Sequence, residues 1–209
     1  MRWIALAAMI AVVRPAAAEQ PEPRSTYVGP EQGFLVDLRI GVALPVAYPT
    51  TGASVVVPVT FGLGWRFRSG SRALAVVEGV PGDFGERAPD PSGAEASGFG
   101  IVLGLEIARP LERVRGRPLI GVLAGLQGLS LDDVRAGVAQ AESWFGWVVR
   151  GTADLPVQLG RLELGLYVAA EVGGWLDHEL DVSGVSTALP VGQALHGMIS
   201  AGVRIGRIL

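Results

Sequence analysis

Two histidines are the side chains of this sequence best suited to acid–base or metal chemistry. His178 lies among Asp177, Glu179 and Asp181, and such carboxylates could hold a hard cation such as Ca²⁺ weakly. A solvated acidic loop explains the same residues, and we favour that interpretation over a metal site.

The second histidine, His196, is four residues from Ser200, so both side chains would point to one face of a β-strand. Four residues of strand span about 13 Å, whereas acid–base catalysis requires contact at about 3 Å. We therefore interpret His196 as a polar residue at the rim of the fold.

The rest of the sequence contains no recognisable catalytic or cofactor-binding motif. It lacks HExxH, GxSxG and a phosphate-binding glycine loop, and none of its 209 residues is cysteine, which excludes disulfides and thiolate-bound metals. A net charge of −3 argues against a nucleic-acid partner. We predict a protein without enzymatic activity and without a cofactor.

Charged residues alternate with apolar ones along the chain, which is typical of strands with two unlike faces. Every even residue from Phe34 to Leu44 is apolar, and so is every odd residue from Val55 to Phe67. The same phase, extended through the chain, assigns nine charged residues to the polar face: Asp37, Arg39, Arg66, Glu106, Arg150, Asp154, Glu163, Glu171 and Arg204.

These alternating stretches exceed the strands of about 5–6 residues usual in soluble proteins. They suit the tilted strands of about 9–11 residues that cross a bilayer. The chain is 49% hydrophobic, yet after the N-terminus it has no run of about 20 apolar residues that would form a membrane-spanning helix. Its 30 glycines are roughly double the usual share of about 7%, as a narrow interior requires. We predict an all-β, antiparallel, up-and-down transmembrane barrel.

The predicted barrel has eight strands, near residues 33–44, 54–68, 72–80, 98–108, 118–128, 145–159, 162–175 and 195–208. The connections between them alternate between short and long, as in outer-membrane barrels, which have short periplasmic turns and longer external loops. We therefore expect both ends of the barrel domain, residues 33–209, to face the periplasm.

The N-terminus has the features of an export signal. Arg2 precedes an apolar core from Trp3 to Val13, and Ala16–Ala18 fits the small-residue rule for cleavage. We expect a cleaved signal peptide over residues 1–18 and a flexible leader over residues 19–32, and a genuine N-terminal helix is the alternative.

Together, the export signal, the eight amphipathic strands, the alternating loop lengths and the terminal strand resemble the small outer-membrane barrels of the OmpA and OmpX type. The last strand alternates Ile199, Ala201, Val203 and Ile205 with smaller or polar residues. The resemblance implies outer-membrane lipid as the surroundings and recognition of the terminal strand by the barrel assembly machinery. In that class the strand usually ends on an aromatic residue, whereas this chain ends on Leu209.

Several local features lead to sharper expectations. A two-residue Gly160–Arg161 turn would place Arg150 opposite Glu171, as a cross-strand ion pair. A two-residue turn at Ser69–Gly70 would point Glu78 outward, and a bulge or a three-residue turn, which we prefer, would point it inward.

Three further expectations concern proline, helical spacing and aromatic residues. We expect bulges at Pro58 and Pro156, because each removes a ladder donor. A short helix is expected near residues 130–141, where Ser130–Asp133 resembles a capping box. Aromatic side chains should form belts at both interfaces: Phe34, Trp65 and Phe67 at the lower one, and Phe99, Trp144, Trp147 and Trp175 at the upper one.

An eight-stranded barrel is just wide enough for its side chains to fill it. We therefore predict that the nine charged residues pair into a closing network and that the external loops bind an unidentified ligand. Three alternatives remain open: a narrow channel for small or apolar solutes, a lipid-modifying outer-membrane enzyme, and a soluble periplasmic barrel that holds a ligand inside.

Overall fold

A computed structural model describes residues 32–46, 55–86, 95–112, 114, 117–135, 138–191 and 195–209. The expected signal peptide and nearly all of the leader lie outside these ranges, so both remain predictions. The strands are β1 (Gly33–Val46), β2 (Val59–Arg66), β3 (Arg72–Glu86), β4 (Glu95–Pro110), β5 (Leu119–Arg135), β6 (Val138–Leu159), β7 (Leu162–Val182), β8 (Val185–Ala188) and β9 (Leu195–Ile208).

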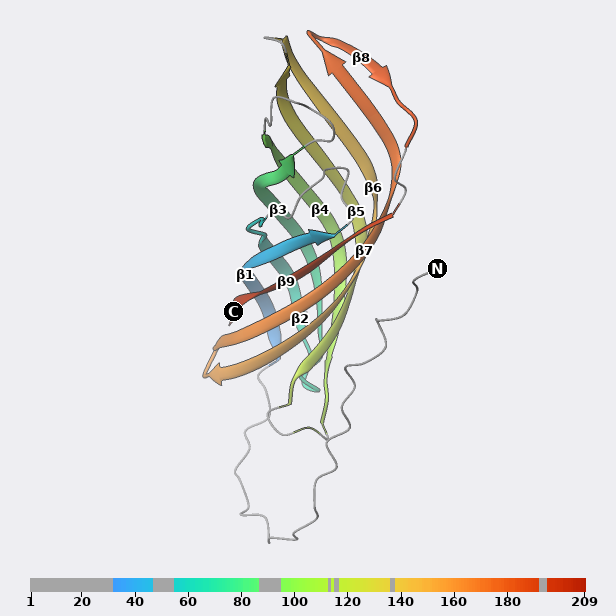
Figure 1. Ribbon diagram of the computed structural model, residues 1–209. Helices are drawn as coiled ribbons and strands as arrows, with labels where there is room; N and C mark the ends of the chain where they lie inside the picture. Colours follow the sequence, from blue (N-terminus) through green and yellow to red (C-terminus); the bar gives the residue numbers. More distant parts are fainter. Residues whose placement is uncertain are drawn as a thin grey trace, which may run out of the picture.

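Eight of these strands form a closed antiparallel barrel (Figure 1). Neighbours in sequence pair from β1 to β7, and β9 closes the ring by pairing with both β7 and β1. Strand β8 is an addition to the ring, because it pairs with β7 at Glu179–Val182, beyond Gly174, which is the partner of the first residue of β9. The described residues include no helix, and thus none long and apolar enough to cross a membrane.

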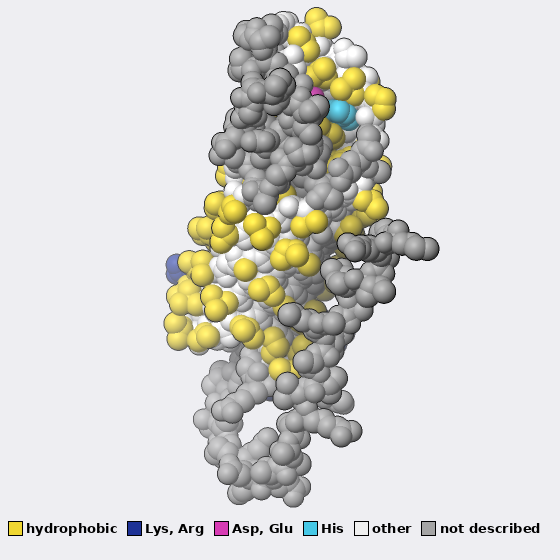
Figure 2. Space-filling model, in the orientation of Figure 1, with side chains coloured by type: hydrophobic (Ala, Val, Ile, Leu, Met, Phe, Trp, Pro, Cys, Tyr) yellow, Lys and Arg dark blue, Asp and Glu magenta, His cyan; other side chains and the backbone are white. Residues whose placement is uncertain are grey.

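The alternation expected from the sequence sets the two faces of the barrel wall. In β1 the side chains of Asp37 and Arg39 are buried, whereas Ile40 is 44% exposed and Val42 is 56% exposed. The other strands follow the same rule, and Figure 2 shows hydrophobic side chains spread over the wall, with few charged ones among them. An exterior of this kind is stable against hydrocarbon and unfavourable against water.

The two ends of the barrel differ. The "turn end" carries Gly33, Leu209 and the connections 67–71, 111–118 and 160–161. The "loop end" carries the other connections and β8, which Figure 1 shows at the top. Strands β5, β6 and β7 are 17, 22 and 21 residues long, more than a bilayer crossing requires, and they continue as a sheet at the loop end.

The predicted β6–β7 hairpin is confirmed. Leu159 pairs with Leu162 and Arg150 pairs with Glu171. Gly160 has a φ of 64°, whereas Arg161 is not among the residues with positive φ, which is the conformation of a type II′ turn with glycine first.

The β2–β3 turn contains three residues, as preferred. The N–H of Gly70 donates to the carbonyl of Phe67 (2.9 Å), and the N–H of Phe67 donates to the carbonyl of Ser71 (2.9 Å). Gly70 has a φ of 81°, so it forms the bulge that follows a type I turn. The extra residue turns Glu78 into the barrel, where it is 1% exposed.

Two expectations about local structure are wrong. The segment from Ser130 to Ala141 is not helical, because β5 extends to Arg135 and β6 starts at Val138. In this segment Ser130 pairs with Ser143, and Asp132 pairs with Ala141. Its helical spacing is overridden because the described residues of this segment find backbone partners in the β5–β6 pair.

No bulge forms at either proline. The β6–β7 register is regular through Pro156, which pairs with Gly165 and lies beyond the last β5 partner, Leu119. Pro58 falls between β2 and an isolated bridge at Val56, and the register is the same on both sides of it. The single irregularity between β6 and β7 lies at Phe145/Gly146.

Candidate functional site

The candidate site is the network of charged side chains inside the barrel. The structure places all nine sequence-predicted residues there, none more than 9% exposed. They reach the lumen from β1, β2, β4, β6, β7 and β9, because each occupies an inward position of its alternating strand.

Arg39 is the centre of one part of the network. Its Nη1 and Nη2 atoms donate to the two carboxylate oxygens of Glu106, both at 2.7 Å, and its Nε atom donates to Oδ1 of Asp37 at 2.9 Å. Two parallel bonds between a guanidinium and a carboxylate are the strongest form of this interaction. The guanidinium also lies over the ring of Tyr167, 6.0 Å from its centroid.

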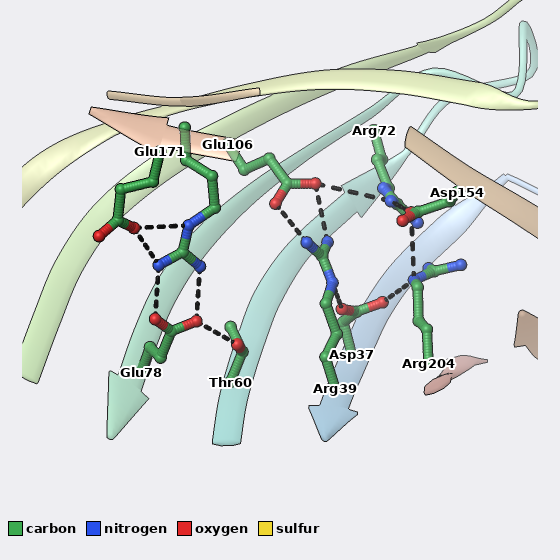
Figure 3. A network of polar contacts seen from close by, with 10 residues as sticks. Asp37, Arg39, Thr60, Arg72, Glu78, Glu106, Asp154, Glu171 and Arg204 are labelled. Carbon is green, nitrogen blue, oxygen red and sulfur yellow. Dashed lines mark hydrogen bonds and ion pairs between the residues drawn. The ribbon is translucent and has the colours of Figure 1, made fainter. Parts of the chain in front are cut away.

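Further arginines continue the network toward the turn end. Arg204 donates from Nη1 to Glu163 at 2.9 Å and from Nε to Asp37, and Arg72 contacts Asp154. Arg66 contacts Glu163, and Arg72 also lies 3.5 Å from Glu106. These residues and the Arg39 group therefore form one connected set, most of which Figure 3 shows. Its four arginines, Arg39, Arg66, Arg72 and Arg204, are balanced by Asp37, Glu106, Asp154 and Glu163.

A second, smaller cluster holds one arginine between two carboxylates. The Nε atom of Arg150 donates to Glu171 at 2.9 Å, and its Nη1 atom donates to Glu78 at 2.5 Å. The hydroxyl of Thr60 donates to the same oxygen of Glu78 at 2.5 Å. Figure 3 shows Glu78 and Thr60 on adjacent strands below Glu171. This cluster contains one more acid than base.

Two members of the network were missed or left open by sequence reasoning. Arg72 is 1% exposed, and Glu78 is 1% exposed. The signal was present, because both are even-numbered residues of β3 and must share a face. Only the conformation of the β2–β3 turn decided which face it was.

An apolar cluster fills the barrel toward the loop end. Its buried members are Ala43, Val56, Val80, Leu129, Leu131, Trp144, Trp175 and Met198. A cavity of about 10 Å³ beside Trp175 and Met198 is at the lower limit of what a single water molecule requires. A second apolar cluster, which includes Leu74, Val102 and Leu123, packs farther along the interior.

The expected upper aromatic belt is wrong at two of its four positions. Phe99 and Trp147 face outward, but Trp144 and Trp175 are 6% and 4% exposed and lie inside. Both follow the inward phase of their own strands. The lower belt is as expected, because Phe34, Trp65 and Phe67 are between 41% and 46% exposed.

The two histidines lie against these interior tryptophans. His196 is 3% exposed, is stacked on Trp175 with a centroid separation of 4.4 Å, and contacts Gln127. It is therefore a packed interior residue and not the rim residue that we expected. Ser200 is also buried.

His178 belongs to β7 and not to a loop. It stacks on Trp144 at 4.6 Å and lies 3.1 Å from Glu142 through Nε2. Its sequence neighbours Asp177 and Glu179 are exposed. Over the described part of the chain, no group of three or more acidic or histidine side chains is arranged to hold a metal ion.

Comparison with known proteins gives fold-level similarity. No family model and no curated protein matches the sequence. The solved structures that resemble it include Neisserial surface protein A, which is 16% identical, with 84% of this chain and 99% of that chain covered and a TM-score of 0.51. Outer membrane protein AlkL, solved in lipid bilayers, is 14% identical, with coverage of 92% and 98% and a TM-score of 0.51.

A major outer membrane protein from Thermus thermophilus is also similar, at 11% identity, coverage of 84% and 99% and a TM-score of 0.50. At these identities the likeness concerns the fold alone. It agrees with the ring of eight strands. By its fold, this chain is therefore a small eight-stranded β-barrel of the outer-membrane type.

Proposed function

We propose that this protein is a closed, non-enzymatic outer-membrane barrel that anchors an extended β-sheet for binding at the cell surface. The observation that carries the proposal is the filled interior, in which the charged network and two apolar clusters occupy the lumen. Paired charges and packed side chains leave little room for a solute path in so narrow a barrel.

The sheet at the loop end supports the surface-binding part of the proposal. Strands β6 and β7 remain paired out to Gln140 and Val182, and β8 adds four residues to the edge of β7. The side chains of β8 are exposed, including Val185 at 67%. A rigid sheet of this kind can hold a binding surface at a fixed distance from the membrane.

Conductance in planar bilayers tests closure. The purified chain should produce no steady current steps, whereas an open porin inserted in the same bilayer should produce them. Stable single-channel steps from the chain would contradict closure and favour a narrow channel. A change in the lipid A mass spectrum of cells that express the chain would contradict the non-enzymatic part of the proposal.

Orientation and location can be tested by cysteine labelling, because the chain has no cysteine of its own. Thr187→Cys in β8 should react with a membrane-impermeant maleimide on intact cells. Ser69→Cys at the turn end should react only after the outer membrane is opened. The reverse pattern would contradict exposure of the loop end, and recovery of the chain in the soluble fraction would contradict membrane anchoring.

A further inference from the structure

A groove of about 690 Å³ lies at the turn end, between the β2–β3 turn and the β4–β5 connection. Its wall includes the outward-facing side chains of Ile107, Ile120 and Val122, which are 64%, 43% and 55% exposed. Ile107 and Val122 are direct cross-strand partners. The groove is therefore continuous with the apolar belt of the barrel.

Arg109 adds a basic side chain to the lining of this groove. It pairs with Ile120 in register and is two residues from Ile107, so its side chain leaves the same outward face. Arg109 is exposed, and its side chain has no ion pair or hydrogen bond with any described residue. Ser69 and Ser71 of the β2–β3 turn also line the groove, together with Glu112.

Charge is distributed unequally between the two ends of the barrel. Exposed arginines at the turn end include Arg68, Arg109, Arg117, Arg161 and Arg207. Acidic residues of the described strands at the loop end include Asp132, Glu142, Asp177, Glu179 and Asp181. Although Glu112 is acidic, the sequence 109–117 contains four arginines, so this part of the turn end carries net positive charge.

We propose that the groove binds a glycerophospholipid with an anionic headgroup. The headgroup phosphate would lie against Arg109 and Ser71, and an acyl chain would lie along Ile107 and Val122. Basic residues near a membrane surface attract anionic headgroups. The apolar wall favours a lipid over free phosphate, because free phosphate has no apolar group that could contact this wall. This inference rests on the proposed embedding in the membrane, and it is independent of whether the lumen is closed.

The test places a fluorescent reporter at the groove. Ser69→Cys is labelled, and the chain is folded into phosphatidylcholine vesicles that contain brominated phosphatidylglycerol or brominated phosphatidylcholine. Brominated phosphatidylglycerol should quench the label at several-fold lower mole fraction. Arg109→Gln should reduce this preference about fivefold, which is the factor contributed by one basic residue near an anionic surface.

Two matched controls accompany this test. Arg207→Gln removes an exposed arginine at the same end but on β9, across the barrel from the groove, and it should change the preference less than about twofold. A label at Ser130→Cys, on the outward face at the loop end, should show no preference for phosphatidylglycerol. Heat-modifiable gel migration verifies that each variant is folded.

The remaining outcomes separate the inference from the proposed function. Equal quenching by both lipids at Ser69, or a preference that Arg109→Gln leaves unchanged, would overturn the groove proposal. Loss of the preference on addition of millimolar inorganic phosphate would identify a phosphate-ion site instead of a lipid site. Absence of quenching by either lipid would contradict membrane embedding itself.

Discussion

Removal of Arg150 should destabilise the barrel far more than removal of either of its acidic partners. The cluster contains one guanidinium between the carboxylates of Glu78 and Glu171, all three at most 8% exposed. Arg150→Met leaves two buried carboxylates facing each other without a counter-charge. Breaking a buried ion pair in this way costs about 3–5 kcal/mol, and the like charges add to that cost.

Glu171→Gln has a different effect on the same cluster. It leaves one arginine against one carboxylate, and the glutamine oxygen can still accept a hydrogen bond from Arg150. We therefore expect a loss of about 1 kcal/mol in the free energy of unfolding. The variant Arg150→Met/Glu78→Gln should be more stable than Arg150→Met alone by at least about 1 kcal/mol, because only one unpaired carboxylate remains.

Equilibrium urea unfolding in lipid vesicles provides the measurement. Tryptophan fluorescence is recorded from both the folded and the unfolded starting states, and heat-modifiable gel migration is an independent readout. Arg207→Gln, a variant of an exposed arginine, should lie within about 0.5 kcal/mol of the unmodified chain. The reasoning fails if Arg150→Met and Glu171→Gln cost the same, or if Arg150→Met costs less than about 1 kcal/mol.

Two further predictions concern packing and strand pairing. Gly41→Ala should destabilise the barrel by about 1–3 kcal/mol, because the new methyl group would overlap the hydroxyl of Tyr167. The control Gly151→Ala meets no atom closer than 4.0 Å and should be nearly neutral. Equal urea midpoints for the two variants would contradict this packing. Cysteines introduced at the paired positions Ser130 and Ser143 should form a disulfide under mild oxidation, since the Cα atoms of paired strand residues are close enough for a disulfide bond. Free thiols after oxidation would contradict the extended β5–β6 hairpin.

The alternation of residue types was sufficient to predict which side chains face inward on most strands. The side-chain period of a strand is fixed at two residues. The sequence alone therefore predicts that Asp37 and Arg39 share one face of their strand, and that Glu163 and Glu171 share one face of theirs. The Gly160–Arg161 hairpin was equally local, because a two-residue turn fixes the register of both strands. The outward position expected for Trp144 ignored this two-residue period, and it was wrong, because Trp144 lies inside the barrel.

Other features depend on how the barrel closes. The Arg39–Glu106 pair joins residues 67 positions apart, and such a contact across the lumen follows from the stagger of the strands and not from either local pattern. Likewise, the segment 130–141 has helical spacing, but its described residues 130–135 and 138–141 form strands, because paired neighbours satisfy the extended backbone. The inner and outer faces of the wall, and the hairpin pair of Arg150 with Glu171, could thus be assigned from local patterns. The long-range partners of the interior charges, such as Glu106 for Arg39, are set by ring closure, which brings distant strands together around one lumen.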